Sequence, residues 1–398
     1  MLSRKNVVLG VTGSIAAYKI ANLASMLVKL NANVTVLMTE NATNFINPIT
    51  FETLTGNKCL IDTFDRNFQF NVEHISLAKK ADIVLIAPAS ANVIGKIANG
   101  IADDMLTTTV MACKCKIMIA PTMNTNMYSN QIVQDNLNKL RGYGYEIIEP
   151  ASGYLACGDI GQGKMVSEES LLNYILKEIA YPKDMAGMHV VVTAGATLEK
   201  LDPVRFISNH STGKMGYAIA KNAMLRGAQV TLISGKTVIA PPPFVNVINI
   251  ESAKEMFDAV KEVVESADVV VKAAAVADYR PKNISEEKIK KQDGNTTVEL
   301  ERTDDILEYI GLNKKNGQFV CGFSMETENL IENSKRKLKN KNMDMVVANN
   351  LKIDGAGFGV DTNVVTIITH DQTKEYPIMP KEEIAERLLT EILTAKRQ

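Results

Sequence analysis

Residues 7–17 read VVLGVTGSIAA, which is an apolar run followed by a glycine-containing turn and the start of an amphipathic segment. The run VVLGV has the unbroken apolar character of a strand buried on both faces of a parallel sheet. VTVLM at 34–38 is a second run of the same kind. Between them, apolar residues recur at helical spacing: Ile20, Leu23, Ala24 and Leu27. A strand, a helix and a strand in this order predict a doubly wound α/β domain.

The same alternation continues along the chain and restarts once. Strand-like runs in the first half lie at 83–87, 116–120 and 145–148. In the second half they lie at 190–195, 230–234, 245–250, 268–275, 319–324, 345–349 and 364–369. Helical patterns lie between many of these runs, as at 168–179, 214–226 and 251–266. The segment YPKDMAG at 181–187 combines proline and glycine, which is typical of a domain boundary. We therefore predict two doubly wound, Rossmann-like domains at 1–180 and 188–398, joined by a linker at 181–187.

Composition excludes several classes of protein. The chain has 398 residues, 46% of them hydrophobic, and a net charge of -1. It lacks the basic surplus of a protein that binds nucleic acid through bulk electrostatics, and it is too apolar for disorder. No apolar run approaches the roughly 18 residues of a membrane span, and we expect no secretory signal before the first strand. Five cysteines without a zinc-type spacing suit a reducing cytosol, so we expect a cytoplasmic protein.

Three segments that follow strands in the first half suit a mononucleotide and a carboxylate. Gly13, Ser14 and Ile15 open the first helix, where free N–H groups favour a phosphate monoester. The G-x-G-x-x-G pattern of a dinucleotide site is absent. APASAN at 87–92 and APTMNTNM at 120–127 follow two further strands, at the edge where open sheets bind ligands. Small residues admit a planar ring and asparagines read its edge or a carboxylate, although asparagine also suits ordinary turns.

Two further residues of the first half attract attention by their chemistry. His74 lies in an expected helix that leads into a strand, where a single histidine is more often structural than catalytic. Cys157 lies in the glycine-dense loop GYLACGDIGQGKM at 153–165, which offers little apolar cover. A thiol in such a loop is a candidate for chemistry rather than for packing.

Taken in order, VTGSIAAYK, HISLAKKAD, APASAN, GIADD, PTMNTNM and ACGDIGQGKM resemble the flavin-dependent cysteine decarboxylases. The resemblance implies a flavodoxin-like flavoprotein domain at 1–180 that binds FMN. It implies cofactor contacts from Gly13, Ser14, Ile15, Thr39, Ser90, Ala91, Asn92 and Val93.

The resemblance also implies a catalytic role for three residues. His74 acts on the substrate, Asn124 holds its carboxylate, and Cys157 supplies the last proton. Oxidation of the thiol by the flavin places the carboxylate β to a C=S bond, from which CO2 leaves. Thr122 and Tyr128 depart from the residues that relatives often carry, alanine and tryptophan.

The second half gathers positive charge and small residues after its strands. Ser211, Thr212 and Gly213 precede a helix and suit an anion or ordinary capping, without the spacing of a phosphate loop. KAAAVADY at 272–279 ends a strand with small residues and then Asp278. Lys288 lies in the polar segment EKIKK, and Lys337 and Lys341 lie four apart on one helix face. Such lysines suit a polyanion or a solvated helix face.

DPVRFISNHSTGKMG, KAAAVADYRP, EKIKK and GFSMETENL resemble phosphopantothenate–cysteine ligase, so both halves together resemble the fused bacterial bifunctional proteins of coenzyme A synthesis. The resemblance implies that Asn209 holds the substrate carboxylate or its adduct. Lys288 neutralises the triphosphate, and Asp278 binds the nucleotide with Mg2+. It implies CTP contacts from Lys272, Ala273, Ala274, Asp304, Asp305, Ile306, Leu307, Phe323, Lys337 and Lys341. At Asp304 relatives often carry proline.

The implied ligation joins 4'-phosphopantothenate to cysteine through an acyl-CMP anhydride, and the decarboxylase half then releases CO2 from the product. The resemblance also implies a trimer-based homo-oligomer, with a dodecamer as the larger particle, and neither nucleic acid nor membrane as a partner. Two other readings are a flavin-binding regulator and an NAD(P)-dependent reductase. A complete ligase half argues against the first. The missing glycine fingerprint and Tyr-Lys pair argue against the second.

Overall fold

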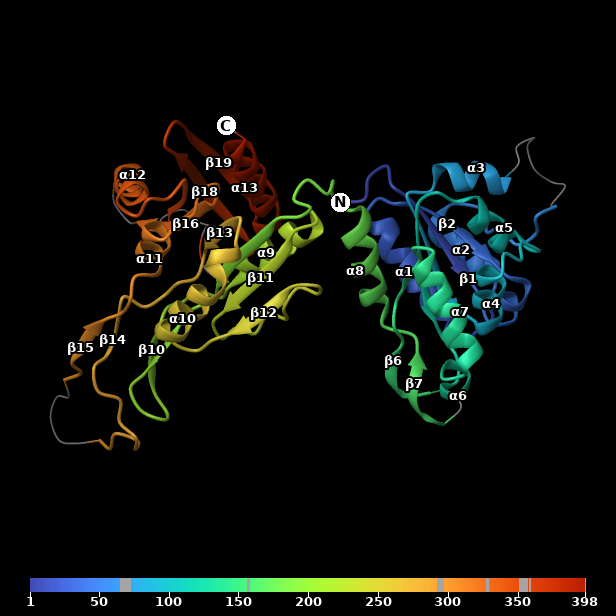
Figure 1. Cartoon of the computed structure of the whole chain (residues 1–398), viewed down its shortest axis with the longest axis horizontal. Helices are drawn as coiled ribbons and strands as arrows, with labels where there is room; N and C mark the ends of the chain where they lie inside the picture. Colours follow the sequence, from blue (N-terminus) through green and yellow to red (C-terminus); the bar gives the residue numbers. More distant parts are fainter. Residues whose placement is uncertain are drawn as a thin grey trace. The chain divides into compact units, whose positions relative to one another are not determined.

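The computed structural model describes residues 1–64, 73–155, 158–291, 297–326, 329–350, 357 and 359–397. The chain divides into two compact units, Met1–Tyr181 and Pro182–Gln398 (Figure 1). Most of the predicted linker packs onto the second unit. Lys183 Nζ donates to the carbonyl of Leu225 at 2.7 Å, and Asp184 pairs with Arg226 at 2.6 Å. The division between the two units falls between Tyr181 and Pro182, within the predicted linker 181–187.

The first unit is built on a five-stranded sheet in which all strands are parallel, in the order β2-β1-β3-β4-β5. Its strands are β1 (Asn6–Val11), β2 (Asn33–Met38), β3 (Ile83–Ala89), β4 (Lys116–Pro121) and β5 (Glu146–Ile147). This order is that of flavodoxin-like sheets, with a reversal of winding between β1 and β3. The predicted fold class is confirmed for this unit.

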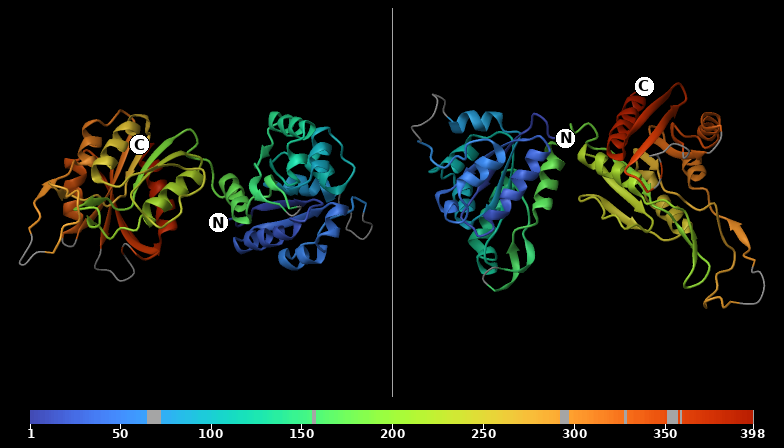
Figure 2. Two further views of the ribbon diagram at one scale, coloured as in Figure 1. Left: turned by 90° about the horizontal axis from the view of Figure 1, so that it is seen from below. Right: turned by 180° about the vertical axis from the view of Figure 1, so that it is seen from behind.

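Helices cover both faces of this sheet, because each strand is apolar on both sides (Figures 1 and 2). One face carries α1 (Ala17–Lys29), α2 (Pro48–Thr55) and α8 (Glu168–Ile179). The other carries α4 (Ala91–Ala98), α5 (Met105–Ala112) and α7 (Gln131–Gly142), whose apolar residues form one core cluster with the strands. The remaining helical segments are η1 (Glu40–Asn44), α3 (Glu73–Lys80) and α6 (Thr125–Tyr128).

An antiparallel hairpin, β6 (Ala151–Tyr154) and β7 (Ile160–Lys164), follows the sheet of the first unit. It was not predicted as strands, because its glycines and polar residues lack the apolar alternation of a half-buried strand. Its glycines have large positive φ angles, 157° at Gly153 and 138° at Gly163, which other residues rarely adopt.

The second unit contains an eight-stranded sheet in the order β12-β11-β8-β13-β16-β17-β18-β19. The first six of these are parallel, and β18 and β19 add an antiparallel edge. The strands are β8 (His189–Ala194), β11 (Gln229–Ser234), β12 (Asn246–Asn249), β13 (Val269–Lys272), β16 (Phe319–Glu326), β17 (Met345–Asn350), β18 (Thr362–Thr369) and β19 (Thr373–Pro380). The doubly wound fold is confirmed here too, whereas β19 was not predicted.

The strand predicted at 268–275 ends earlier, at Lys272. The backbone N–H groups of Ala273 and Ala275 donate to the carbonyls of Thr193 and Gly195, at 3.2 and 2.9 Å. The chain therefore turns over the end of β8 instead of continuing beside β16. An apolar alanine run does not reveal this turn, because alanine is compatible with either path.

Two groups of helices enclose the second sheet. α9 (Lys214–Leu225) packs against α13 (Lys381–Lys396) and against β8 and β11. On the other face, α10 (Ala253–Val263), α11 (Ile306–Leu312) and α12 (Leu330–Asn340) share one core cluster with the strands, beside η2 (Val264–Ser266). No helix in the described parts of the chain is long and apolar enough to cross a membrane.

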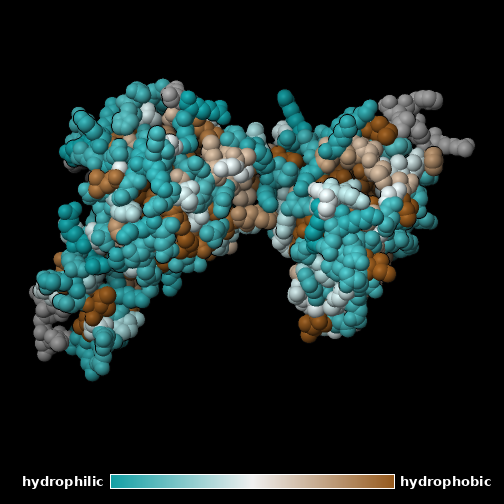
Figure 3. Space-filling model, in the orientation of Figure 1, coloured by the Kyte–Doolittle hydropathy of each residue, from teal (hydrophilic) through white to brown (hydrophobic). Residues whose placement is uncertain are grey.

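Two narrow ribbons extend from the second unit beyond its sheet (Figures 1 and 2). They are the antiparallel pairs β9 (Leu198–Lys200) with β10 (Phe206–Ser208), and β14 (Tyr279–Pro281) with β15 (Leu300–Arg302). Apolar side chains are exposed on both, including Phe206 at 54% and Tyr279 at 52% (Figure 3). These short pairs were not predicted, because three residues carry no readable alternation.

We expect Asp184→Ala to loosen the attachment of α13 to α9. Arg226 is 5% exposed and donates two hydrogen bonds to Asp184, and it also contacts Thr390 of α13 at 3.1 Å. Removing the carboxylate leaves a buried guanidinium without its counter-ion, which costs about 2 kcal/mol where one partner is partly exposed. Hydrogen exchange of α13 amides in the full chain measures this loss. Asp258→Ala breaks an exposed pair with Lys254 and should change the exchange by under about 0.5 kcal/mol.

Candidate active sites

A cavity of about 430 Å3 lies at the ligand edge of the first sheet, where the segments after β1, β3 and β4 converge. It brings together six residues that the sequence singles out, along with residues of the β6–β7 hairpin. The predicted site residues in its lining are Gly13, Ser14, Ile15, Ser90, Ala91 and Asn124. The cavity therefore joins the expected phosphate end of the site to the expected carboxylate clamp.

The hydroxyl of Thr12 fixes the turn after β1 relative to the turn after β3. Its Oγ1 donates to the carbonyl of Pro88 at 2.7 Å and accepts from the N–H of Ser90 at 2.9 Å. Ser90 in turn caps α4, since its Oγ accepts from the N–H of Val93 at 3.4 Å. The side chain of Val93 points into the core and is 2% exposed, so only its backbone is available to a ligand.

The turn that precedes α1 has the features of an anion site. The N-cap residue Ala16 makes no side-chain cap, and the N–H groups of Ala16 and Ala17 donate to the Oγ and the carbonyl of Ser14, at 3.3 and 3.0 Å. The positive end of the helix dipole at this turn favours an anion. A Cβ on Gly13 would lie 2.8 Å from the Cβ of Asn41, so glycine serves close approach here. Thr39, two residues before Asn41, is 9% exposed, and its buried Oγ1 has no hydrogen-bond partner. A buried hydroxyl without a partner is costly, which fits a missing polar ligand.

Asn124 is held by its own helix and by the β6–β7 hairpin. Its Oδ1 accepts from the N–H of Asn126, and its Nδ2 donates to Asp159, both at 2.8 Å. The hairpin lies directly on this segment, because the N–H of Met123 donates to the carbonyl of Gly163 at 3.1 Å. Cys157, which belongs to the same hairpin loop, lies outside the described residues.

The structure does not bring His74 to this cavity within one chain. His74 lies half-buried on α3, which packs against α5. Figure 1 shows α3 and α6 at opposite ends of the first unit, so His74 and Asn124 are far apart. Asn92 is exposed on α4 and, like Thr39, does not line the cavity.

In the second unit, a partly buried ammonium group marks the ligand edge. Burial, and then the charge of Lys337, lower the pKa of Lys272 to about 8, while Asp305 and Asp278 act in the opposite direction. Lys272 ends β13 and Lys337 lies on α12, so two distant segments concentrate positive charge here. Two lysine side chains held close together in this way favour a polyanion.

The other predicted nucleotide residues divide into polar and core positions. Lys341 Nζ bonds to Asp305 at 2.9 Å and to Glu308 at 3.2 Å, and Asp304 lies 3.9 Å from Lys254. Ile306 and Leu307 are 2% and 5% exposed within the core, so their side chains are structural. Phe323 is half-buried in β16, and Asp278 is exposed after the turn Ala273–Ala274.

Asn209 and Lys288 lie on the two ribbons. Asn209 follows β10, and its Nδ2 donates to the carbonyl of Ala275 at 3.1 Å. This bond places the amide beside the turn that follows β13. Lys288 is exposed in the segment between β14 and β15.

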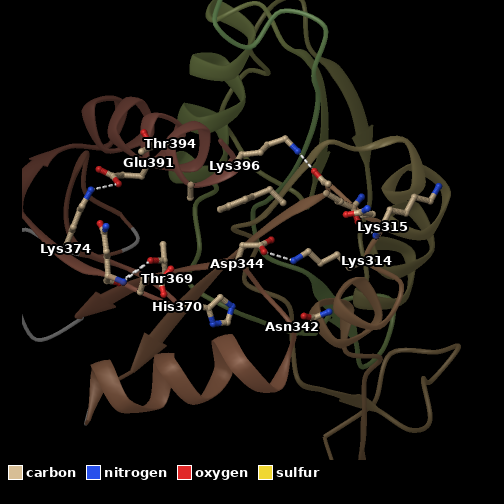
Figure 4. A pocket seen from close by; sticks show the side chains of 17 residues that line it. Lys314, Lys315, Asn342, Asp344, Thr369, His370, Lys374, Glu391, Thr394 and Lys396 are labelled. Atoms are coloured by element: carbon tan, nitrogen blue, oxygen red, sulfur yellow. Dashed lines mark hydrogen bonds and ion pairs between the residues drawn. The ribbon is translucent and has the colours of Figure 1, made fainter. Parts of the chain in front are cut away.

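A larger cavity, of about 890 Å3, lies at the opposite edge of the second sheet (Figure 4). It contains several lysines, but each is already paired within the protein. Lys314 bonds to Asp344 at 2.6 Å, and Lys374 bonds to Glu391 at 2.7 Å. It contains none of the predicted site residues, and it lies at the strand starts rather than at the ligand edge.

Sequence reasoning missed the residues that hold these sites in place. Thr12, Asp159, Thr193 and Asp202 each bond to a segment distant in sequence. All four lie within the motifs or the predicted strand runs of the sequence. Neither kind of pattern reveals which residue contacts the ligand and which supports it.

Two family models match the chain. One, described as Flavoprotein, matches residues 1–180, and one, described as DNA/pantothenate metabolism flavoprotein C-terminal domain, matches residues 185–395. The chain is 46% identical over 402 residues to the coenzyme A biosynthesis bifunctional protein CoaBC of Bacillus subtilis (strain 168), covering 100% of this chain and 99% of that protein. The protein of the same name from Borreliella burgdorferi is 42% identical over 391 residues, covering 98% and 99%. A crystal structure of the C-terminal domain of CoaBC is 42% identical, covers 53% of this chain and 96% of that chain, and has a TM-score of 0.46.

We expect Gly163→Ala to displace the β6–β7 hairpin from Asn124. A Cβ at this position would lie 2.3 Å from the carbonyl oxygen of Met123, a distance that backbone atoms do not tolerate. The release of CO2 should fall by at least about 10-fold, since a 1 Å displacement of a reacting group can cost about 100-fold. Gly153→Ala is the matched control, because it shares a large positive φ but its Cβ would meet nothing nearer than 3.7 Å. Equal loss of activity in both variants would contradict the contact argument.

We expect binding of a nucleoside triphosphate to take up protons above pH 8. The pKa of Lys272 is about 8 in the free protein, and a bound polyanion raises it by favouring the ammonium form. Affinity should therefore weaken as pH rises through 8. Calorimetry at pH 8.5 in buffers of different ionisation enthalpy measures the uptake, which Lys272→Arg should abolish because a guanidinium stays charged. Uptake that persists in this variant would assign the proton to another group.

Proposed function

The chain belongs to the family of coenzyme A biosynthesis bifunctional proteins, and we propose here how its residues divide the two activities. The protein has a flavoprotein decarboxylase half and a ligase half. We assign residues 1–180 to the conversion of 4'-phosphopantothenoylcysteine to 4'-phosphopantetheine. We assign residues 188–398 to the joining of 4'-phosphopantothenate and cysteine, with residues 181–187 between them.

FMN is the flavin that the cavity of the first unit fits best. Its phosphate would lie at Gly13, Ser14 and Ile15, at the N-terminal turn of α1. Ser90 and Ala91 would contact the rest of the cofactor, with the backbone of Val93 and the side chain of Asn92 beside them. The unpaired Oγ1 of Thr39 supports a polar ligand at this edge. When bound, FMN supplies reversible oxidation of the substrate thiol, which makes loss of CO2 possible.

The residues of this chain would bind and orient the substrate. Asn124 would donate through Nδ2 to the substrate carboxylate, in place of its present bond to Asp159. Cys157 would deliver the final proton from the hairpin loop, and His74 would act on the substrate beside the flavin. His74 and Asn124 are far apart in one chain, so a site that uses both requires two copies (Figure 1). This supports a homo-oligomer, which we take to be trimer-based and up to a dodecamer.

In the ligase half, positive charge is the observation that carries the proposal. Burial and the charge of Lys337 lower the pKa of Lys272. Lys341 bonds to Asp305, whose charge also acts on Lys272. We propose that these three lysines bind the phosphates of CTP, with Lys288 completing the neutralisation. The backbone of Ala273 and Ala274, the segment Asp304–Leu307 and Phe323 would contact the nucleotide. A compact lysine group of this kind stabilises charge on departing phosphates through electrostatics.

Mg2+ would arrive with the nucleotide rather than occupy a cage made by the protein. Among the described residues, no three His, Cys, Asp or Glu side chains form a group that could hold a metal ion. Mg2+ is commonly held by one or two carboxylates together with phosphates, and Asp278 offers one exposed carboxylate. The residues present fit this arrangement.

The ligation then proceeds in two balanced steps. The carboxylate of 4'-phosphopantothenate, held by Asn209, attacks the α-phosphorus of CTP and releases pyrophosphate. The amine of cysteine next attacks the acyl carbon of this anhydride and displaces CMP. Four described cysteines, Cys59, Cys113, Cys115 and Cys321, are free thiols, which supports our placement of the enzyme in the cytoplasm.

The proposal is tested with the full chain, supplied with 4'-phosphopantothenate, cysteine and one nucleotide at a time. We expect a yellow protein that releases pyrophosphate with CTP and forms 4'-phosphopantetheine. Asn209→Asp should lower pyrophosphate release at least about 100-fold, because it removes the N–H donor and adds a negative charge beside a carboxylate. Decarboxylation of supplied 4'-phosphopantothenoylcysteine should be unchanged. Parallel loss of both activities would refute the assignment of Asn209 to one half.

A further inference from the structure

The carboxylate of Asp202 lies at the bend of the β9–β10 ribbon and is buried, at 2% exposed. It accepts from the backbone N–H groups of Val204 and Arg205, both at 2.8 Å. The guanidinium of Arg205 adds bonds from Nε at 2.9 Å and Nη2 at 2.5 Å. Burial alone would raise the pKa of Asp202, but these donors hold it well below its usual range, so the carboxylate is ionised.

The same carboxylate also holds a loop far away in sequence. The N–H of Ile289 donates to Asp202 Oδ2 at 3.1 Å, and the carbonyl of Ile289 accepts from Arg205 Nη2 at 2.6 Å. A third bond joins the N–H of Ser285 to the carbonyl of Leu201 at 3.0 Å. The residue just before Ile289 is Lys288, whose side chain is exposed. Both backbone hydrogen-bonding groups of Ile289, its N–H and its carbonyl, are therefore held. These bonds fix the backbone on the C-terminal side of Lys288.

The ribbon that carries Asp202 also carries Asn209. β9 and β10 pair with Ile207 opposite Glu199, and Ser208 Oγ donates to the carbonyl of Thr197 at 2.8 Å. Asn209 then bonds to Ala275 at the ligand edge. Hydrogen bonds along this ribbon thus connect the backbone beside Lys288 to Ala275, three residues after Lys272.

We propose that Asp202 is a positioning residue for the ligation reaction, because its carboxylate, together with Arg205, fixes the backbone at Ile289 and so orients Lys288. The inference rests on the proposed role of Lys288 in neutralising the triphosphate. Lys288 lies in a polar segment without helix or strand, and ordering such a backbone costs about 1–2 kcal/mol per residue. Contacts that order it in advance place its charge where negative charge develops.

A double-mutant cycle tests this role in the full chain. Asp202→Asn removes the charge and one of the two acceptor oxygens. We expect pyrophosphate release to fall by about 10- to 100-fold in kcat, with a smaller change in the KM for CTP. Lys288→Ala should cause a comparable loss. If Asp202 acts through Lys288, Asp202→Asn in the Lys288→Ala background should cost little more. Full additivity would overturn the proposal, because it would limit Asp202 to the stability of its own turn.

A second variant keeps the test valid if Asp202→Asn disturbs the ribbon. Ile289→Pro removes the N–H that donates to Asp202, and it also fixes φ at position 289 and restricts the backbone of Lys288. It should reproduce the fall in kcat, whereas the matched control Ile289→Ala, which keeps the N–H, should retain most activity. Equal activity of the two variants would overturn the proposal.

Two further controls separate this inference from the function on which it rests. Glu299→Gln removes a carboxylate of the β14–β15 ribbon that bonds to Lys282 at 2.6 Å in an exposed position, and it should leave ligation unchanged. Decarboxylation in the same variants reports on the first unit. A wild-type chain without CTP-dependent pyrophosphate release would refute the proposed function itself. A normal wild-type chain with a fully active Lys288→Ala variant would overturn the role of Lys288, and with it the positioning role of Asp202, but not the ligase activity.

Discussion

Two buried threonine hydroxyls hold the ligand edge of both sheets, and both proposed sites depend on them. Thr12 follows β1, and its hydroxyl bonds to the backbone of Pro88 and Ser90 where β3 ends. Thr193 lies in β8, and its Oγ1 accepts from the N–H of Ala274, which follows β13, at 3.2 Å. Both threonines are 0% exposed. Each hydroxyl spans the pair of strands at which the winding of its sheet reverses, where helices leave in opposite directions and a ligand has access to the strand ends. These bonds add to the backbone hydrogen bonds that hold the turns carrying Ser90 and Ala274, such as those of Ala273 and Ala275 to the end of β8.

The sequence was sufficient for the parallel strands of both sheets but not for the edge strand β19, the hairpin and the ribbons. Strands such as β1 and β8 are apolar on both faces, so an unbroken run of valine and leucine identifies them without knowledge of their neighbours. The strands of the hairpin and of the two ribbons are short or polar, and their conformation depends on contacts that the local sequence pattern does not contain. These strands are β6, β7, β9, β10, β14 and β15. Gly163 illustrates this. The carbonyl oxygen of Met123 leaves no room for a Cβ at this position, and the sequence around Gly163 does not reveal that contact.

The site residues divide in a similar way. Gly13, Ser90 and Asn124 were predicted from their positions after strands, and the topology brings such positions to one edge. The predicted roles of Ile306 and Leu307 do not extend to their side chains, which pack in the core, because a motif records a segment and not the direction of each residue. Asp202 was missed for a related reason. A carboxylate that binds backbone N–H groups 87 residues away has no signature in its own neighbourhood.

The two halves place opposite demands on their residues, which explains why they share a fold but not a type of site. The first cavity is lined largely by small, apolar and amide side chains, as a planar redox ring and one carboxylate require. The second site concentrates lysines. Holding Lys272 near Lys337 lowers the free energy of unfolding of this unit, because burial and like charge disfavour the ammonium form. A cofactor that stays bound can be recognised by shape and backbone donors. A triphosphate is cleaved in every turnover, so its site needs positive charge that interacts more strongly as negative charge develops on the leaving group. Such stabilisation requires cations on an ordered backbone. The anchoring of the backbone beside Lys288 by Asp202 and Arg205 supplies that order.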